Sequence, residues 1–430
     1  MKKIFFWVLG DVVFLRNFAG MNNDSYVTVT PVVSVPGSKS ISNRLLMLRQ
    51  TVVPGLCISG LSASDDTRLL RQLLERVDAS QEGDGIVELD VRNCGTAFRF
   101  LLPYLAGKRG RWRLTGAEPL RQRPIVPLVK LLRSWGAEIR MPEEGSIPIE
   151  VTGNPALQPQ SAWVDVAQSS QFLSALLLAL PAYGKAVRLR YAPDAPSGAY
   201  VRMTVGLMRE LGLPVTESAG EVCYEPGSFS APPSQWRVEG DWSAAAFWWA
   251  WAALQPPPFA LRVQGVSETS WQGDARICRL LAPWGLHTVF TADGAWVGKT
   301  APLKLPASFR MDARDCLDLV PLLAVLCLLS GIPARFDGVA NLRAKESDRV
   351  EALRDNLSPW ADVTLEAGSL CLLPNGNPVR EAVSFRSFND HRVVMALQLF
   401  SAFVPVLHDH PEAVSKSYPA FWEQFAMIRP

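Results

Sequence analysis

Six segments of the chain share one pattern, in which a short polar cluster is followed by a long apolar run. They begin at residues 38, 93, 168, 240, 316 and 389, and after the first interval their starts lie about 72–76 residues apart. Runs such as FLSALLLAL (172–180) and AAAFWWAWAAL (244–254) are apolar around nearly the whole helical circumference, which is typical of a buried helix. Ser, Asn or Asp stands near each start, as an N-cap requires. The pattern therefore predicts six buried helices.

A second series of segments alternates with the first. Segments 128–139, 204–215 and 276–288 have the spacing of amphipathic helices, and each helix ends at a glycine before a short β-like stretch. Segment 352–364 is a fainter copy with Ala361 in place of the glycine. Each repeat then contains one exposed helix, one buried helix and several short strands. About six such α/β units fit the chain, which suggests two domains of three units each.

Composition narrows the class of protein. The chain has 430 residues, 48% apolar and 20% charged, with a formal net charge of only +2, so a general nucleic-acid binder is disfavoured. Its seven cysteines form no CxxC pair and it has four histidines, so we expect no structural metal site. Such scattered thiols are typical of a cytoplasmic protein.

The first twenty residues, MKKIFFWVLGDVVFLRNFAG, need separate treatment. Two lysines precede an apolar run, as in a signal peptide, but Asp11 and Arg16 interrupt it and it is too short to span a membrane. We expect residues 1–20 to be an N-terminal extension, with an ordered extra strand or a true signal as the alternatives. The apolar segments 243–254 and 319–329 are also too short to span a membrane and are expected to be buried helices.

The polar helix starts are the places where chemistry is expected. A buried helix presents free N–H groups and a positive dipole end at its N-terminus, so several such ends facing one cleft would bind anions. The first start, PGSKSISNR (36–44), adds Lys39 and Arg44 but lacks the second glycine of a P-loop. An ordinary helix start capped by Ser40 or Ser42 is the alternative. Ser169, Ser170 and Gln171 offer more polar groups than a cap needs.

The other candidates each have an ordinary structural explanation as well. Asp318 is either an N-cap or a carboxylate placed as a base. The segment NLRAKESDR (341–349) is either a charged surface or a binding site. For His391 the ordinary explanation is a hydrogen-bonded structural residue, whereas Arg392 beside it and Arg123 before Pro124 are candidate anion ligands. Residue patterns alone leave these alternatives open.

Taken in order, the motifs closely resemble those of 5-enolpyruvylshikimate-3-phosphate (EPSP) synthases. The resemblance runs from about Val35 to Phe425 and rests on PGSKSISNR, N-x-GTA-x-R, RP, SSQFL-x-ALL, VEGD-x-S, SWQGD, KESDR, NDHR and K-S-x-P. It implies two similar domains, each of three βαβαββ-type units with buried parallel helices, an inside-out α/β barrel. The implied domains are 21–37 plus 238–430, discontinuous, and 38–237, inserted. The active site would lie in the cleft between them.

The resemblance also implies the reaction and the roles of residues. An EPSP synthase transfers the enolpyruvyl group of phosphoenolpyruvate to the 5-hydroxyl of shikimate 3-phosphate and releases phosphate. By resemblance, Asp318 is the base, Glu346 the acid, and Lys39 contacts both substrates. The shikimate 3-phosphate ligands would be Lys39, Ser40, Arg44, Ser169, Ser170, Gln171, Ser197, Tyr200, Asp318, Asn341 and Lys345. The phosphoenolpyruvate ligands would be Lys39, Gly95, Arg123, Gln171, Arg349, Arg392 and Lys416.

The expected partners are therefore the two small substrates, with no cofactor, metal, nucleic acid or membrane, and a monomeric chain. The sequence leaves three alternative functions. A UDP-N-acetylglucosamine enolpyruvyl transferase shares the fold but has motifs different from SKSISNR and KESDR. A non-catalytic homologue would have lost an acid, a base or a cation, and all are present. A nucleotide-dependent kinase would need the missing P-loop spacing.

Overall fold

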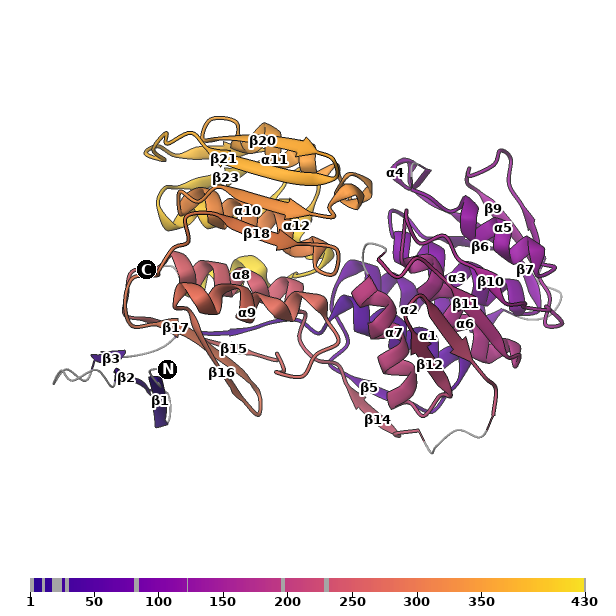
Figure 1. Ribbon diagram of the computed structural model, residues 1–430. Helices are drawn as coiled ribbons and strands as arrows, with labels where there is room; N and C mark the ends of the chain where they lie inside the picture. Colours follow the sequence, from indigo (N-terminus) through magenta and orange to yellow (C-terminus); the bar gives the residue numbers. More distant parts are fainter. Residues whose placement is uncertain are drawn as a thin grey trace. The chain divides into compact units, whose positions relative to one another are not determined.

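The computed structural model describes residues 31–428 except 81–84, 122, 195–197 and 228–231, together with the backbone of three strands nearer the N-terminus. Its residue contacts divide the chain into two compact units. The inserted unit is Ser38–Val238, and the flanking unit consists of Met1–Gly37 and Glu239–Pro430. Figure 1 draws the inserted unit from indigo to magenta and most of the flanking unit from salmon to yellow.

The inserted unit holds two four-stranded sheets of identical construction. In each sheet the first strand pairs in parallel with the second, and the other two neighbouring pairs are antiparallel. A third sheet has two parallel strands. The strands, in spatial order, are β6 (Ile86–Asp90), β7 (Gly110–Thr115), β9 (Ile149–Gly153) and β8 (Glu138–Arg140); β10 (Ala162–Trp163), β11 (Val187–Arg190), β13 (Glu221–Tyr224) and β12 (Val215–Ser218); and β14 (Gln235–Arg237) and β5 (Cys57–Ser59).

Three helices fill the interior of the inserted unit, and others lie outside them. The inner helices are α1 (Lys39–Thr51), α3 (Gly95–Gly107) and α6 (Gln171–Tyr183). In α6 every residue from Phe172 to Leu180 is buried, because this stretch carries no charge and packs on α1, α3 and α7. The remaining helices are α2 (Asp65–Ala79), α4 (Glu118–Arg121), α5 (Val126–Ser134) and α7 (Gly198–Glu210).

The flanking unit repeats the same sheet construction. Two four-stranded sheets again contain one parallel and two antiparallel pairs, and a two-stranded parallel sheet completes the set. The strands are β4 (Val32–Ser34), β15 (Phe259–Gln264), β17 (Gly294–Lys299) and β16 (His287–Thr291); β18 (Phe309–Asp312), β19 (Ala334–Asp337), β21 (Ser369–Pro374) and β20 (Ala361–Glu366); and β22 (Val383–Phe385) and β23 (Val406–His408).

The inner helices of the flanking unit are α8 (Trp242–Leu254), α10 (Val320–Leu329) and α12 (His391–Leu397). Alanines of α8 let its aromatic residues reach the C-terminal helix α13 (Phe421–Ile428). The Phe247 and Phe421 rings lie 4.9 Å apart and the Trp251 and Phe425 rings 5.0 Å apart. Burying each such ring contributes about 2–3 kcal/mol, which fixes the end of the chain on the core. The remaining helical elements are η1 (Gly273–Arg276), α9 (Ile277–Leu281), η2 (Ala282–Trp284), η3 (Leu317–Leu319), η4 (Ala340–Ala344), α11 (Arg349–Leu357), η5 (Gln398–Ala402) and η6 (Pro411–Lys416).

The predicted repeat of six buried helices is confirmed, and so is the α/β class with two similar domains. The repeats are not all equal, however. Within the described residues, four of them carry a four-stranded sheet and the third of each unit carries only two strands. Figure 1 shows the sheets outside and the long apolar helices inside, as in an inside-out barrel.

The predicted amphipathic helix at 276–288 is shorter than its pattern suggested. It is divided into η1, α9 and η2, and the α-helical part spans only five residues. Pro283 cannot donate the N–H that would continue the helix, and Gly285 ends the segment with φ +101°. The pattern of apolar positions persists through both helix types because their periods are similar.

The N-terminal extension contains strands. The backbone of β1 (Ile4–Leu9) pairs antiparallel with β2 (Val12–Asn17), which pairs with β3 (Ser25–Val27). The expected extension 1–20 therefore holds two strands. None of the helices in the described parts of the chain is long and apolar enough to cross a membrane.

The chain leaves and re-enters the flanking unit at one place. Gly37 forms an antiparallel bridge with Gly240, and the two positions adjoin the boundaries of the inserted unit. A Cβ atom on Gly240 would lie 2.6 Å from Val35 Cγ2 and 2.9 Å from the backbone of Gly265. Glycine is therefore required at this crossing by close packing.

Candidate active site

The polar starts of three helices meet inside the inserted unit. Gln171, the first residue of α6, accepts a hydrogen bond from Arg99 Nη1 of α3 at 2.7 Å and donates to Thr96 Oγ1 at 3.1 Å. Arg44 of α1 donates to Ser174 Oγ of α6 at 3.2 Å. These bonds join the first turns of α1, α3 and α6, so their positive dipole ends lie together. The geometry favours negative charge at this end of the unit.

Arg44 is a buried cation whose hydrogen-bond partners among the described residues are all uncharged. Its side chain is 3% exposed, and burial lowers the pKa of the guanidinium to about 10, so it stays charged at neutral pH. The acceptors are Ser40 O, Thr204 Oγ1, Ser174 Oγ and Tyr200 O, at 2.8–3.3 Å. Neutral acceptors hold the guanidinium in place without cancelling its charge.

Different residues at the start of α1 serve as the N-cap and as the predicted ligands. Ser38, and neither Ser40 nor Ser42, is the N-cap, with its hydroxyl accepting from Ile41 N at 3.5 Å. The alternative of a cap at Ser40 or Ser42 is therefore wrong. The Ser40 hydroxyl makes no hydrogen bond with any described residue. Lys39 Nζ forms an ion pair with Asp66 Oδ2 of α2 at 3.2 Å.

Gly95 and Arg123 lie against each other at the start of α3. A Cβ atom on Gly95 would be 2.5 Å from Arg123 Nη1, so a side chain there would displace the guanidinium. Arg123 Nη2 is buried and has no hydrogen-bond partner among the described residues. Arg99 holds the neighbouring turn by donating to Pro124 O at 3.0 and 3.3 Å. A half-buried arginine with a buried, unused donor beside a helix N-terminus is suited to an anionic ligand.

The remaining predicted residues of the inserted unit lie at the starts of α6 and α7. The Ser169 hydroxyl accepts from Gln171 N at 3.3 Å. Ser170 is 5% exposed, and its hydroxyl makes no hydrogen bond within the described parts of the chain. The Tyr200 ring lies 5.6 Å from the Arg44 guanidinium. Ser197, the other predicted residue here, lies outside the described residues.

A second cluster lies in the flanking unit and centres on Arg349. Its side chain is 1% exposed and binds three carboxylates from three different segments. Nη1 lies 2.6 Å from Asp318 Oδ1, Nη2 lies 3.1 Å from Glu346 Oε2, and Nε lies 2.8 Å from Asp390 Oδ2. The candidate base and the candidate acid are therefore held by one guanidinium.

Electrostatics keep Asp318 ionised in this cluster. Burial opposes its ionisation, but Lys345, Arg349 and Arg392 outweigh burial and hold the pKa of Asp318 well below its usual value. Lys345 Nζ lies 3.5 Å from Asp318 Oδ1. Asp318 is placed in η3 and is not an N-cap, because the cap position of α10 is Leu319.

Arg392 has unused donors, as Arg123 does. It is 6% exposed, and its Nε and Nη1 atoms are buried without hydrogen-bond partners among the described residues. Its Nη2 atom lies 3.6 Å from Asp241 Oδ1. Lys416, at the end of η6, is half-buried and forms no ion pair within the described residues; Asn341 is half-buried in η4.

Comparison with known proteins shows which family this chain belongs to. The sequence pattern of EPSP synthase (3-phosphoshikimate 1-carboxyvinyltransferase) matches residues 25–425. A 3-phosphoshikimate 1-carboxyvinyltransferase of Bacteroides fragilis is 32% identical over 92% of this chain and 94% of its own, and one of Nitrosomonas europaea is 34% identical over 92% and 95%. The chain belongs to the EPSP synthase family.

Solved structures agree with this EPSP synthase family assignment at the level of the fold. An EPSP synthase from Acinetobacter baumannii has a TM-score of 0.72 at 22% identity and covers 92% of this chain and 95% of its own. The enolpyruvyl transferase NikO from Streptomyces tendae has a TM-score of 0.63 at 18% identity, with 92% and 94% covered. Transferase activity is the activity for which the family is named.

Sequence reasoning about this EPSP synthase family member assigned no role to Arg99 and Asp390, two motif residues that hold the predicted ligands in place. Arg99 orients Gln171, and Asp390 is fully buried between Arg349 and the start of α12. A signal existed for Asp390, since an aspartate directly before an apolar helical run is a strong N-cap candidate. Arg99 is the arginine of the N-x-GTA-x-R motif, but its partners Gln171 and Pro124 come from distant segments, so the motif did not reveal its role.

Proposed function

We propose that this EPSP synthase family member transfers the enolpyruvyl group of phosphoenolpyruvate to the 5-hydroxyl of shikimate 3-phosphate, with its two clusters acting on one pair of substrates. The observation that supports this most directly is the arrangement around Arg349. One buried guanidinium holds Asp318 and Glu346, the residues assigned as base and acid by resemblance. The reaction needs one group that accepts a proton and one that donates a proton at adjacent positions.

The cations of both clusters suit the charges of the substrates. Each substrate carries one carboxylate and one phosphate, and arginine binds either group through two parallel hydrogen bonds. In the proposal, the shikimate 3-phosphate ligands are Lys39, Ser40, Arg44, Ser169, Ser170, Gln171, Ser197, Tyr200, Asn341 and Lys345. The phosphoenolpyruvate ligands are Lys39, Gly95, Arg123, Gln171, Arg349, Arg392 and Lys416. The unused donors of Arg123 and Arg392 support this assignment.

The proton transfers run between substrates and the two carboxyl groups. Asp318 takes the proton of the 5-hydroxyl as the hydroxyl oxygen bonds to C2 of phosphoenolpyruvate. Glu346, which this step requires in its protonated form, gives a proton to the methylene carbon. The tetrahedral intermediate then loses a methyl proton to Glu346 while the C2–O bond to phosphate breaks, and the departing phosphate takes up the proton held by Asp318. Overall, the 5-hydroxyl proton leaves with phosphate and both carboxyl groups return to their starting states.

Substrate binding should itself strengthen the base. Without ligand, three cations hold the pKa of Asp318 well below its usual value, although burial alone would raise it, and such a carboxylate is a weak proton acceptor. Anionic groups bound to Arg349 and Arg392 would offset that positive charge and raise the pKa of Asp318. Since all three donor groups of Arg349 already contact carboxylates, we propose that phosphoenolpyruvate replaces at least one of them.

The proposal includes the state and setting of the enzyme. One chain carries every residue assigned to the two clusters, which supports a monomeric enzyme. Its seven cysteines are present as free thiols, a state suited to the reducing cytoplasm.

The decisive experiment is phosphate release from shikimate 3-phosphate and phosphoenolpyruvate. We expect activity in the wild type and a loss of at least about 100-fold in Asp318→Ala and Lys39→Met, because each removes a proton-transfer or charge-stabilising group. Lys185→Met, at an exposed lysine, is the matched control and should retain full activity. A folded wild type that releases no phosphate would exclude the proposal. Release with UDP-N-acetylglucosamine in place of shikimate 3-phosphate would favour the other transferase.

A further inference from the structure

Asp274 is a buried acid that none of the roles above uses. It lies in η1, is 5% exposed, and its Oδ2 atom is buried without a hydrogen-bond partner among the described residues. The side chain of Ser243, at the start of α8, is close enough to Asp274 to lower the pKa of its carboxyl group. An ionised carboxylate with an unsatisfied buried oxygen is costly, whereas a protonated one is not. The surroundings therefore favour a proton on Asp274.

Burial and two neighbouring carboxylates favour a proton on Asp274, and two other groups oppose it. Burial has the largest effect and Asp318 of η3 the next, and Asp241 of α8 adds to them; the Arg392 guanidinium of α12 and the Ser243 hydroxyl oppose them. Together they raise the pKa of Asp274 to about 7. The other titratable groups nearby are Cys316, whose pKa burial raises to about 12, Arg276, whose Nη1 lies 3.7 Å from Cys316 Sγ, and Cys278 and the exposed Arg279 of α9.

Arg392 is the cation that this cluster of acids shares. Asp241, Asp274 and Asp318 all interact with it, yet its Nε and Nη1 groups have no acceptor in the described structure. An anion bound to those groups would sit close to the three carboxyl groups. A proton on Asp274 removes one of the negative charges that would repel this anion. Asp274 is the acid expected to take the proton, because the other two acids are closer to cations or to a helix N-terminus.

We propose that Asp274 is a proton-carrying positioning residue, whose protonation tightens the binding of an anionic substrate group at Arg392 and whose ionisation weakens it. The inference rests on the proposed function for the identity of that substrate, phosphoenolpyruvate. Asp274 itself need not touch the substrate. Its proton and the anion are linked, so anion binding draws a proton onto Asp274 and a rise in pH through neutrality releases both.

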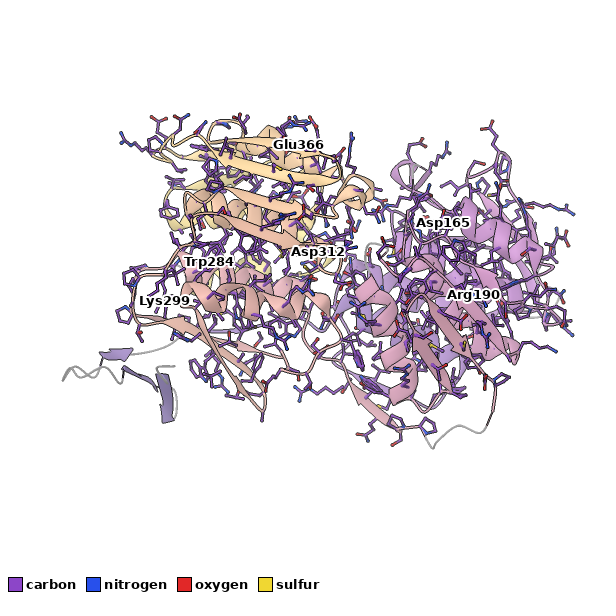
Figure 2. The ribbon with its side chains drawn as sticks, viewed as in Figure 1. Asp165, Arg190, Trp284, Lys299, Asp312 and Glu366 are labelled. Atoms are coloured by element: carbon purple, nitrogen blue, oxygen red, sulfur yellow. The ribbon has the colours of Figure 1, made fainter. Side chains whose placement is uncertain are left out.

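The first test compares the Michaelis constant for phosphoenolpyruvate in wild type and Asp274→Asn from pH 5.5 to 8.5. Asparagine mimics the protonated acid, so the two constants should agree near pH 5.5. By pH 8.5 the constant of the wild type should be about tenfold higher than that of the variant, with kcat little changed. Ionisation of the substrate itself affects both enzymes equally. Asp312→Asn, at an exposed acid labelled in Figure 2, is the matched control and should follow the wild type.

A ratio of the two constants that stays the same at every pH would overturn the proposal. Inactive wild type would instead contradict the proposed function, so the two failures differ. Ser243→Ala provides a second variant, because removing a hydroxyl that lowers the pKa of Asp274 should move the pH dependence to higher pH without abolishing it.

A binding measurement keeps the proposal testable if Asp274→Asn does not fold. Calorimetric titration of the wild type with phosphoenolpyruvate at pH 7.5, in buffers of different ionisation enthalpy, reports the protons taken up. Uptake of a measurable fraction of a proton, beyond the contribution of the ligand, is expected. No uptake by protein that binds the ligand would overturn the proposal.

Discussion

The two units hold their buried cations in opposite ways. In the inserted unit, Arg44 donates to uncharged oxygens and Arg123 has an unused donor. In the flanking unit, Arg349 contacts three carboxylates, and Arg392 pairs with the carboxylate of Asp241 while two of its donors are unused by the described residues. The first arrangement leaves positive charge available to a ligand, whereas the second nearly balances it.

This difference suits a division of labour on one fold. Neutral acceptors fix a guanidinium without neutralising it, so the inserted unit is suited to holding anions. Carboxylates held by shared cations have displaced pKa values, so the flanking unit is suited to moving protons. The same helix starts, repeated six times, thus acquire different chemistry from the residues that accept their hydrogen bonds.

The largest effect is expected from removing the shared cation of the flanking unit. Arg349→Met should lower the free energy of unfolding by about 3–5 kcal/mol and abolish activity, because it leaves three buried carboxylates without their partner. Urea unfolding and phosphate release measure the two effects. Arg386→Met removes an exposed arginine of the same unit and should cost less than about 1 kcal/mol. An equal loss of unfolding free energy in Arg349→Met and Arg386→Met would contradict this prediction.

The pH dependence of stability offers a second test within the flanking unit. The pKa of Asp274 is about 7 in the folded chain, above its usual value, so the folded state keeps a proton that the unfolded state releases between pH 4 and 7. The contribution of Asp274 to stability therefore falls as the pH rises through that range. In urea unfolding, the free energy of unfolding of Asp274→Asn minus that of the wild type should increase by on the order of 2 kcal/mol from pH 4.5 to pH 7.5. A constant difference would contradict the prediction.

Removing the matching cation of the inserted unit should cost less stability. Arg44→Met leaves uncharged acceptors unsatisfied and no stranded carboxylate, so we expect a loss of about 1–2 kcal/mol. The Michaelis constant for shikimate 3-phosphate should rise at least about tenfold, because a charge-assisted hydrogen bond is lost. Arg44→Lys, which keeps the charge, should restore part of the affinity. A stability loss as large as that of Arg349→Met would remove the distinction between the units.

The smallest effect on stability is expected at Arg123. Its side chain has a buried donor without a partner in the described structure, so Arg123→Met should change the free energy of unfolding by less than about 0.5 kcal/mol. The Michaelis constant for phosphoenolpyruvate should nevertheless rise about tenfold or more. Steady-state kinetics with phosphoenolpyruvate varied would decide, and an unchanged constant would place Arg123 outside the binding site.

Periodicity predicted the fold well because each repeat is a local pattern. The buried run at 244–254 and the glycine after the helix at 128–134 are visible without knowledge of distant contacts. Local rules failed where several residues were equally suitable for the same structural position. Ser38, Ser40 and Ser42 are equally good caps by type, and only the structure distinguishes them.

The predicted site residues were placed by resemblance, and their partners required the structure. Glu346 is a local neighbour of Arg349, three residues before it, whereas Asp318 and Asp390 reach Arg349 only through tertiary packing. Asp274 likewise shows no local sign of its displaced pKa, which arises from burial and from Asp318 across the core.

The route of the chain also fixes the order in which the protein can be completed on the ribosome. Strand β4 is synthesised before the inserted unit, but it pairs in parallel with β15, which emerges only after the whole of Ser38–Val238. The inserted unit has all its strand partners in its own sequence, so it can fold while the flanking unit still lacks most of its core. During that interval Val32–Ser34 is an unpaired edge, and its length of three residues limits the risk of pairing with another nascent chain.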